Sequence, residues 1–172
     1  MAASITGDGV VALITDASEA LTSEQWARRA VDLAIELGAS EIAVETYTAG
    51  TTYVRVLKDA MKRVRRLARH ITVTPWRGKG DAESRSAAIR QAFEVGTCRI
   101  AGQLPDFETA CLGWQSGQHQ PDALAAAVIA HDRLVKTAGQ QMHIVSPIEA
   151  ARRARKGTLP AAPAWMTRRI GG

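Results

Sequence analysis

Two acidic residues lie far apart in the sequence, at positions from which they could bind one metal ion. Glu45 lies at the end of the apolar segment "EIAVET", directly before a turn, and Asp122 stands at the start of the alanine-rich stretch "PDALAAAVIAHDRLV". Ligands of α/β sheets gather at the carboxyl ends of strands, and a helix that begins over that edge would bring the two acids together. Neighbouring carboxylates repel each other unless a cation lies between them. Because oxygen ligands alone suit Mg²⁺ or Mn²⁺, the pattern predicts a divalent metal site that also binds phosphate oxygens.

Each acid also has a simpler interpretation. An Asp in the first turn of a helix stabilises the helix dipole by about 0.3–1 kcal/mol without any ligand. A Glu at the end of a strand is usually only solvated. The spacing of Glu45 and Asp122 therefore leaves both a metal site and a purely structural role open.

Several basic residues near these acids could contact a phosphate. Lys79 lies between two glycines in the loop "RGKG", and such a lysine suits phosphate binding. Arg77 in the same loop and Arg85 shortly after it are further candidates for contacts to DNA. His119, three residues before Asp122, could assist a metal-bound water or a leaving group. All four side chains could equally be ordinary solvated surface groups.

The expected secondary structure alternates strands with helices. Apolar, β-branched "VVALITD" (10–16) predicts a strand, and "AASIT" before it predicts a hairpin partner joined through Gly7-Asp8-Gly9. The next helix is expected to begin at Ser18 or at Thr22/Ser23 and to end at Gly38. The following elements are a strand at 41–46, a helix from 51 to about 68, a strand at 71–76, a helix at 81–96, a strand at 97–102, a short helix within 104–117 and a helix from 121 to about 136.

This order of elements predicts an α/β layered domain over residues 1–138. The strand at 41–46 is apolar in its middle, so we expect it to be buried on both faces and not to be an edge strand. From Gly139 onward the apolar periodicity disappears and three prolines follow, which predicts an extended tail over 139–172.

The positive charge of the chain is concentrated in this tail. Six of the 22 basic residues lie in 151–172, which holds no acid, so the remainder has 16 basic and 17 acidic residues. A nearly neutral body with a basic arm suggests a polyanionic or acidic partner for the arm, although a solvated basic end explains the same pattern.

Some function classes lack their sequence signature. The sequence has no G-x-x-x-x-G-K-[ST] loop, which is typical of nucleoside triphosphatases, and no G-x-S-x-G nucleophile elbow, which is typical of α/β-hydrolases. It has no apolar run of membrane-spanning length, and we expect no contact with a membrane. Its two cysteines, Cys98 and Cys111, show no metal-binding spacing, which favours reduced, inert thiols.

The order of motifs resembles the nuclease domain of the large terminase subunit of tailed bacteriophages. "ITDASEALTSEQWARRAVDLAIELGASEIAVETYTAG" is similar to that family's strand ending in Asp, its helix opening near a Trp, and its strand ending in a Glu that binds metal. "GKGDAESRSAAIRQAFEVGTCRIAGQLPDFETACLGW" and "QPDALAAAVIA" resemble its lysine loop, its arginine-containing helix and its closing Asp-Ala helix. The resemblance covers about residues 7–137.

This resemblance implies an RNase H-like fold, a mixed β-sheet flanked by helices, followed here by a basic tail. It implies a two-metal endonuclease that cuts concatemeric viral DNA during genome packaging in the host cytoplasm, with Mg²⁺ or Mn²⁺ as the cofactor. Glu45 and Asp122 occupy the metal-ligand positions, and Asp16 is a further candidate ligand.

The sequence departs from the family pattern at its amino end. The family's first strand, which carries its first catalytic Asp, would precede the hairpin at Gly7-Asp8-Gly9, and so would its ATPase domain. We therefore expect a fragment that pairs with an upstream chain or rearranges so that "AASIT" moves inward. We expect the tail to contact the portal or procapsid through "PAWMTRRI". The alternatives are a catalytically inactive module that binds DNA or the portal, and another RNase H-like nuclease such as a junction resolvase.

Overall fold

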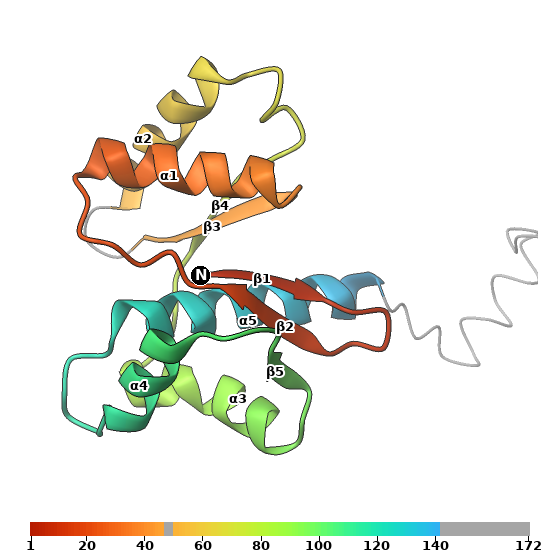
Figure 1. Cartoon of the computed structure of the whole chain (residues 1–172), viewed down its shortest axis with the longest axis vertical. Coiled ribbons are helices and arrows are strands. Elements are labelled where there is room, and N and C mark those ends of the chain that lie inside the picture. Colours follow the sequence, from red (N-terminus) through yellow and green to blue (C-terminus); the bar gives the residue numbers. More distant parts are fainter. Residues whose placement is uncertain (47–49, 142–172) are drawn as a thin grey trace, which may run out of the picture. The chain divides into compact units, whose positions relative to one another are not determined.

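The computed structural model describes residues 1–46 and 50–141, which form five strands and five helices (Figure 1). Residues Met1–Ala138 cluster as one compact unit, which contains all of these elements except the end of the last helix. The elements are, in order, β1 (Ala2–Ile5), β2 (Val11–Thr15), α1 (Ser23–Glu36), β3 (Glu41–Glu45), α2 (Gly50–Arg63), β4 (Thr72–Trp76), α3 (Ala82–Glu94), β5 (Cys98–Ile100), α4 (Pro105–Gly113) and α5 (Asp122–Gln141).

Local sequence signals predicted most of these elements. The hairpin of β1 and β2 is confirmed, with Gly9 at a φ of 85° in the turn, a conformation that glycine adopts without a steric penalty. Thr22 caps α1 in a capping box with Gln25, and Asp81 caps α3 by accepting a hydrogen bond from the backbone N–H of Ser84.

The prediction for the second helix was wrong at its carboxyl end. We expected a helix to about Ala68, whereas α2 ends at Arg63 and the chain continues in turns. Hydrogen bonds between residues three apart, of the 3₁₀ type, tighten this segment; one runs from the Leu67 N–H to the Val64 carbonyl at 2.9 Å. Ala68 and Ile71, which follow these turns, are buried in the core beside α1 and α2.

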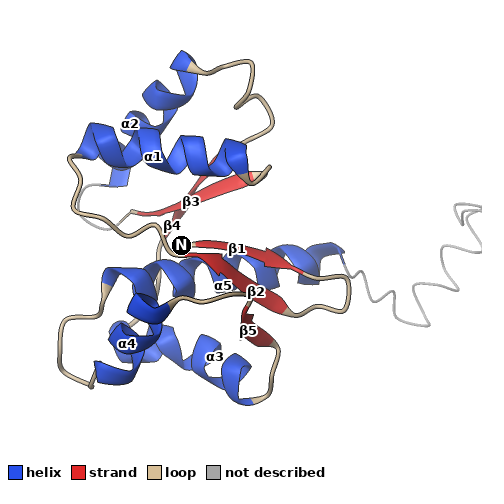
Figure 2. Cartoon of the chain, in the orientation of Figure 1, coloured by secondary structure: helices blue, strands red, loops and turns tan. Residues whose placement is uncertain are grey.

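The described strands form two sheets (Figure 2). In the first sheet, with the order β1-β2-β5, β1 is antiparallel to β2 and β5 is parallel to β2. In the second sheet, β3 and β4 are parallel. The α/β class is therefore confirmed, and one of the two sheets is mixed. We expected a single mixed sheet, and among the described residues no hydrogen bond joins β1 or β2 to β3 or β4.

Strand β3 combines an open edge with two covered faces. Among the described strands it pairs only with β4, so the expectation that it would not be an edge strand was wrong. Its side chains nevertheless alternate between two cores: Ile42 and Val44 pack with α1 and α2, whereas Ala43 packs on the opposite side. The apolar composition of β3 reflects this two-sided covering and not an interior place in a sheet.

Helices α1 and α2 cover one face of the β3–β4 sheet, and helices α3, α4 and α5 pack around the β1-β2-β5 sheet (Figure 1). The first core is built from α1, α2 and their two strands, and Trp26 meets Tyr53 there edge to face at 5.8 Å between ring centroids. The larger core brings α5 against the other sheet; its fully buried members include Val11, Leu13, Ile89, Phe107 and Ala127.

Helix α5 also holds the β3–β4 sheet through polar contacts. The Arg133 guanidinium donates from Nε to Glu41 Oε1 at 2.7 Å, and the Trp76 indole Nε1–H donates to Asp132 Oδ2 at 2.6 Å. Both sheets therefore rest on one helix, which fixes the ends of β3 and β4 relative to it. Within the part of the chain that the structure describes, every helix is too short or too polar to cross a membrane.

Candidate functional site

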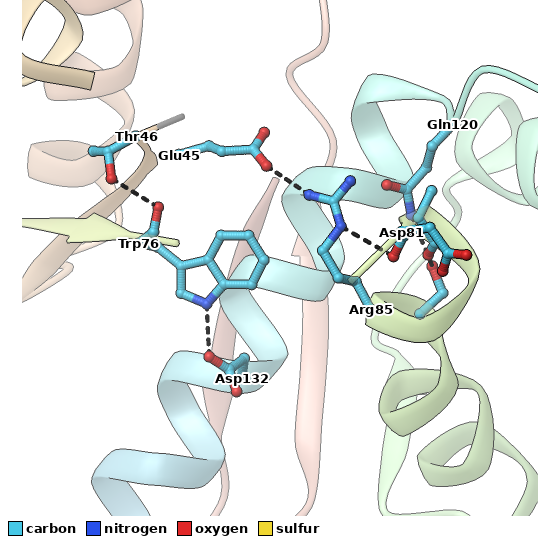
Figure 3. A network of polar contacts seen from close by, with 9 residues as sticks. Glu45, Thr46, Trp76, Asp81, Arg85, Gln120 and Asp132 are labelled. Atoms are coloured by element: carbon cyan, nitrogen blue, oxygen red, sulfur yellow. Dashed lines mark hydrogen bonds and ion pairs between the residues drawn. The ribbon is translucent and has the colours of Figure 1, made fainter. Parts of the chain in front are cut away.

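Glu45 is the last residue of β3, and the backbone around it is firmly paired. It lies in register with Trp76 of β4, and the backbone N–H of Thr46 donates to the Trp76 carbonyl at 2.9 Å. The Glu45 side chain points away from this pair and accepts a hydrogen bond at Oε1 from Arg85 Nη1 at 2.7 Å (Figure 3). The Glu45 side chain is 36% exposed and that of Arg85 18%, so the ion pair is partly shielded from water.

Arg85 is held in place by the start of α3. Its Nε donates to the Asp81 carbonyl at 3.3 Å, and its stem lies against the loop at Gly78. Asp81 caps the helix, and the hydrogen bonds from Ser84 hold the pKa of the Asp81 carboxyl below its ordinary value. The guanidinium that meets Glu45 is thus positioned by a well-formed helix start.

Asp122 is the first residue of α5 and is exposed. The segment just before it is anchored by Gln120, a buried amide whose Nε2 donates to Ser86 Oγ at 2.7 Å. Ser86 in turn donates to the Ala82 carbonyl at 2.8 Å, inside α3. The start of α5 is therefore tied to α3 one residue after Arg85.

Consecutive residues of α3 thus connect the two acids of interest. Arg85 bonds Glu45 (Figure 3). Ser86 bonds Gln120, which lies two residues before Asp122. No direct hydrogen bond joins the Glu45 and Asp122 side chains among the contacts of the described residues, as expected for two carboxylates. The predicted pair remains a prediction, with α3 as the structural link between its members.

Asp16, the third candidate ligand, lies in a different setting. It follows β2, and its Oδ1 accepts from the Ser18 backbone N–H at 3.1 Å and from the Ser18 hydroxyl at 2.6 Å. Its charge acts on the amino group of Met1 and on the thiol of Cys111. These neighbours place Asp16 beside the start of β1 and α4, and among the described contacts none links it to Glu45 or Asp122.

The predicted phosphate-binding residues are all at the surface or partly exposed. Arg77 is exposed and donates from Nη2 to the Thr46 carbonyl at 3.4 Å, directly after Glu45. Lys79 is exposed in the same loop, and His119 is exposed before α5. Arg77 and Arg85 therefore both contact residues at the end of β3. Among the described contacts, none joins His119 to that end of the strand.

A polar cluster around Asp132 of α5 was not predicted from the sequence. Asp132 accepts hydrogen bonds from Trp76 Nε1 at 2.6 Å and from Lys136 Nζ at 2.7 Å. Burial raises the pKa of the Asp132 carboxyl, but these two hydrogen bonds together with the charges of Lys136 and Arg133 leave the pKa below its ordinary value. The four-residue spacing of Asp132 and Lys136 was the available signal, whereas the partner Trp76 comes from 56 residues away.

His131, beside Asp132, is a second residue that sequence reasoning missed. Only 8% of its surface is exposed, and among the described residues it makes no hydrogen bond or ion pair. Burial lowers the pKa of the imidazole, while the Asp132 carboxylate partly opposes that shift. A histidine within an apolar helical stripe was the only sequence signal.

The carboxylates of Glu45 and Asp122 are the chemical type of ligand that a hard divalent cation prefers. Magnesium is usually held by one or two carboxylates and completes its shell with water and phosphate oxygens. Glu45 and Asp122 could supply two such carboxylates. Among the described residues no group of three or more His, Cys, Asp or Glu side chains is placed to form a complete protein cage. Metal binding by these two acids therefore stays a prediction, and it would require Glu45 to exchange Arg85 for the ion.

Comparison of the chain with models of protein families, with curated proteins and with solved structures finds no match.

Proposed function

We propose that this chain is a metal-dependent endonuclease acting on DNA, equivalent to the nuclease part of a large terminase subunit. The observation that carries the proposal is the double connection made by α3, in which Arg85 contacts Glu45 and Ser86 contacts the segment before Asp122. The order of sequence motifs supports the same reading. The RNase H-like arrangement of the strands belongs to this proposal.

In this proposal Glu45 and Asp122 hold Mg²⁺ or Mn²⁺. Such an ion polarises a phosphate oxygen and lowers the pKa of a bound water, which supplies the nucleophile for phosphodiester hydrolysis. In the metal-free protein Arg85 pairs with the Glu45 carboxylate at the end of β3. Arg77, which reaches the carbonyl after Glu45, and Lys79 bind backbone phosphates of double-stranded DNA next to the acids. The ion has to replace Arg85 at Glu45, which disfavours binding of metal alone. Because a DNA phosphate would supply further oxygen ligands to the ion, binding of DNA and metal together is favoured.

The unpaired strand edges support a partner that supplies a strand. Among the described residues β1 pairs only with β2 and β3 only with β4, so β1 and β3 each keep one unpaired edge. Ala3 and Ile5 of β1 and Ala43 of β3 nevertheless pack against the same core. Such edges pair readily with an added strand. The proposed donor is an extended segment of the ATPase-bearing chain, and its binding would slow hydrogen exchange at the backbone of both strands; unchanged exchange would contradict it.

The expected contact of the tail with a portal or procapsid falls on residues 142–172, which lie outside the described residues. It stays a proposal based on the basic composition of 151–172. Binding of a procapsid by the full chain but not by a chain ending at residue 141 would support it. Equal binding by both chains would exclude the tail as the contact.

The nuclease proposal is tested by nicking of supercoiled plasmid in the presence of Mn²⁺. Wild-type protein should nick the plasmid, and the variants Glu45→Gln and Asp122→Asn should each lose this activity. Glu94→Gln is a matched control, because Glu94 is an exposed acid at the end of α3. Nicking that persists in both site variants would exclude these acids as the metal ligands.

A non-catalytic DNA-binding module is the second candidate. The ion pair between Glu45 and Arg85 favours it, because a carboxylate already paired with a guanidinium is stable without a metal ion. This candidate predicts DNA binding that is unchanged by Mn²⁺ or by EDTA, with no nicking under either condition. Metal-dependent nicking by purified wild-type protein would remove it.

A further inference from the structure

A pocket of about 350 Å³ opens between the loop after β4, helix α3 and helix α5. Its floor is apolar and belongs to the larger core, with Trp76, Ile89 and Val128 all nearly buried. The polar side chains that line it are almost all basic: Arg77, Lys79, Arg85, His131 and Lys136, with Asp132 as the one acid.

The charges around this pocket are not balanced within the described part of the chain. Lys136 is paired with Asp132 at 2.7 Å, and Arg85 is paired with Glu45 at 2.7 Å. No acid forms an ion pair with Arg77 or Lys79 among the described residues. Two positive charges on the loop therefore face the pocket without compensation, which favours an anionic ligand.

The loop that carries these charges is built close to the pocket wall. A Cβ on Gly78 would lie 2.4 Å from Cδ of Arg85 and 2.5 Å from Cη2 of Trp76, so only glycine allows this approach. Gly80 has a φ of 78°, which also favours glycine. The two glycines let Lys79 sit between them at the rim of the pocket.

His131 adds an imidazole to the wall of the pocket. It lines the pocket, is more than nine-tenths buried, and makes no hydrogen bond or ion pair with the described residues. No side-chain nitrogen or oxygen of the described residues is both fully buried and without a hydrogen bond, so the imidazole nitrogens stay accessible at the pocket wall. An anion in the pocket would accept a hydrogen bond from the imidazole and from the cations around it.

We propose that this pocket binds one backbone phosphate of a nucleic-acid strand through Lys79, Arg77 and His131. Every donor is an N–H group, and a phosphate accepts several such bonds at once. Arg85 lines the pocket and contacts Glu45, so the bound phosphate lies next to the proposed metal site. The identity of the ligand as DNA rests on the proposed function, whereas phosphate binding itself requires neither metal nor cleavage.

The site makes DNA binding dependent on pH. The charged groups that line the pocket with His131 are Arg77 and Lys79 of the loop, Arg85 of α3, and Asp132 with its partner Lys136 on α5; of these, the Asp132 charge acts on the imidazole in the free protein. Burial lowers the pKa of the imidazole from its ordinary value of 6.5, so the free protein carries it neutral at pH 7. A bound phosphate diester favours the protonated form. Binding should therefore tighten as the pH falls from 7.5 to 6, a range in which the diester itself does not titrate.

The experiment measures binding of a short DNA duplex by the full chain in EDTA, so that no metal or cleavage contributes. Lys79→Ala should weaken binding about tenfold and reduce the slope of log affinity against log salt by about one. Lys58→Ala is the matched control, because Lys58 is an exposed lysine of α2 away from the pocket. Equal weakening in both variants would overturn the proposal in favour of diffuse attraction.

The role of His131 has its own control. His131→Gln should remove the pH dependence of DNA binding between pH 6 and 7.5, whereas His70→Gln, at an exposed position, should retain it. Persistence of the pH dependence in His131→Gln would overturn the assignment. Titration with inorganic phosphate distinguishes a free phosphate ion from a backbone phosphate of a nucleic acid as the ligand. Lys79-dependent binding of inorganic phosphate without any DNA binding would rule out a nucleic-acid strand as the occupant. If wild-type protein binds DNA but does not nick the plasmid, the nuclease proposal fails and the phosphate-binding proposal stands.

Discussion

Replacing Gly78 by alanine should destabilise the fold through a steric overlap that can be located atom by atom. The added Cβ would lie 2.4 Å from Arg85 Cδ and 2.5 Å from Trp76 Cη2. Carbon atoms in contact are normally about 3.5–4.0 Å apart, so both pairs overlap by about 1 Å. Trp76 yields little, because the residue is only 8% exposed and its Nε1–H is bonded to Asp132. The relief must come from the loop and from Arg85.

The size of the effect follows from two opposing terms. Overpacking of this kind typically costs about 1–3 kcal/mol of folding free energy. Replacing glycine by alanine also restricts the unfolded chain, which stabilises the fold by about 0.4–1 kcal/mol. Gly102→Ala isolates the second term, because a Cβ there meets nothing within 4 Å and Gly102 does not have a positive φ. The difference in unfolding free energy between the two variants should therefore be about 1–3 kcal/mol.

Urea unfolding of the wild type and both variants, followed by far-ultraviolet circular dichroism, measures this difference. Gly102→Ala should match or exceed the wild type in stability, and Gly78→Ala should fall below it. Since Arg85 must move, Gly78→Ala should also weaken DNA binding in EDTA, whereas Gly102→Ala should not. Equal unfolding free energies for the two variants would refute the close packing of the loop against Trp76 and Arg85.

Three further predictions concern the core, the pH dependence of stability and the thiols. Phe107→Ala should lower the unfolding free energy by about 3–5 kcal/mol, because Phe107 is 2% exposed; Leu112→Ala, at 89% exposure on the same helix, should change it little in the same urea titration. The folded pKa of Asp132 is below its ordinary value of 3.8, so its contribution is present above that pH and is lost as the pH falls through the lower folded value. The stability gap between wild type and Asp132→Asn should therefore be constant near pH 6 and shrink below about pH 4; a gap that widens on acidification would show that the sign is wrong. Burial raises the pKa of both Cys98 and Cys111 to about 11, so native protein at pH 8 should react with a disulfide reagent much more slowly than unfolded protein; rapid native labelling would contradict that environment.

The sequence predicted those features of the fold that depend on neighbouring residues. The Gly7-Asp8-Gly9 hairpin, the cap at Thr22 and the cap at Asp81 each act through contacts within a few residues. These contacts are the same in any fold that contains the segment, so residue type and spacing were sufficient to predict them.

The features that could not be predicted depend on partners distant in the chain. The pairing of β5 with β2, and the separation of the strands into two sheets, follow from how helices α3 to α5 fill the space around them. Helical periodicity gives the apolar face of α5 but not the partner of each polar residue on it. For this reason Asp132 and His131 were missed, although Trp76 and the pocket give both a definite environment.

The candidate site was predicted in its residue types more than in its contacts. Glu45 at a strand end and Asp122 at a helix start are where the sequence predicted them. The ion pair of Glu45 with Arg85 was not predicted, because forty residues separate the two and a basic residue in a helix has many possible partners. In the proposed function, a metal ion would have to compete with this guanidinium for Glu45.

The most direct test of the central claim is calorimetric titration of Mn²⁺ into the protein in the presence of a short DNA duplex. If Glu45 and Asp122 share one cation, wild-type protein binds Mn²⁺ and each of the variants Glu45→Gln and Asp122→Asn loses most of that affinity, with the double variant little worse than either single one. Wild-type affinity in either single variant, or no Mn²⁺ binding by the wild type, would contradict it.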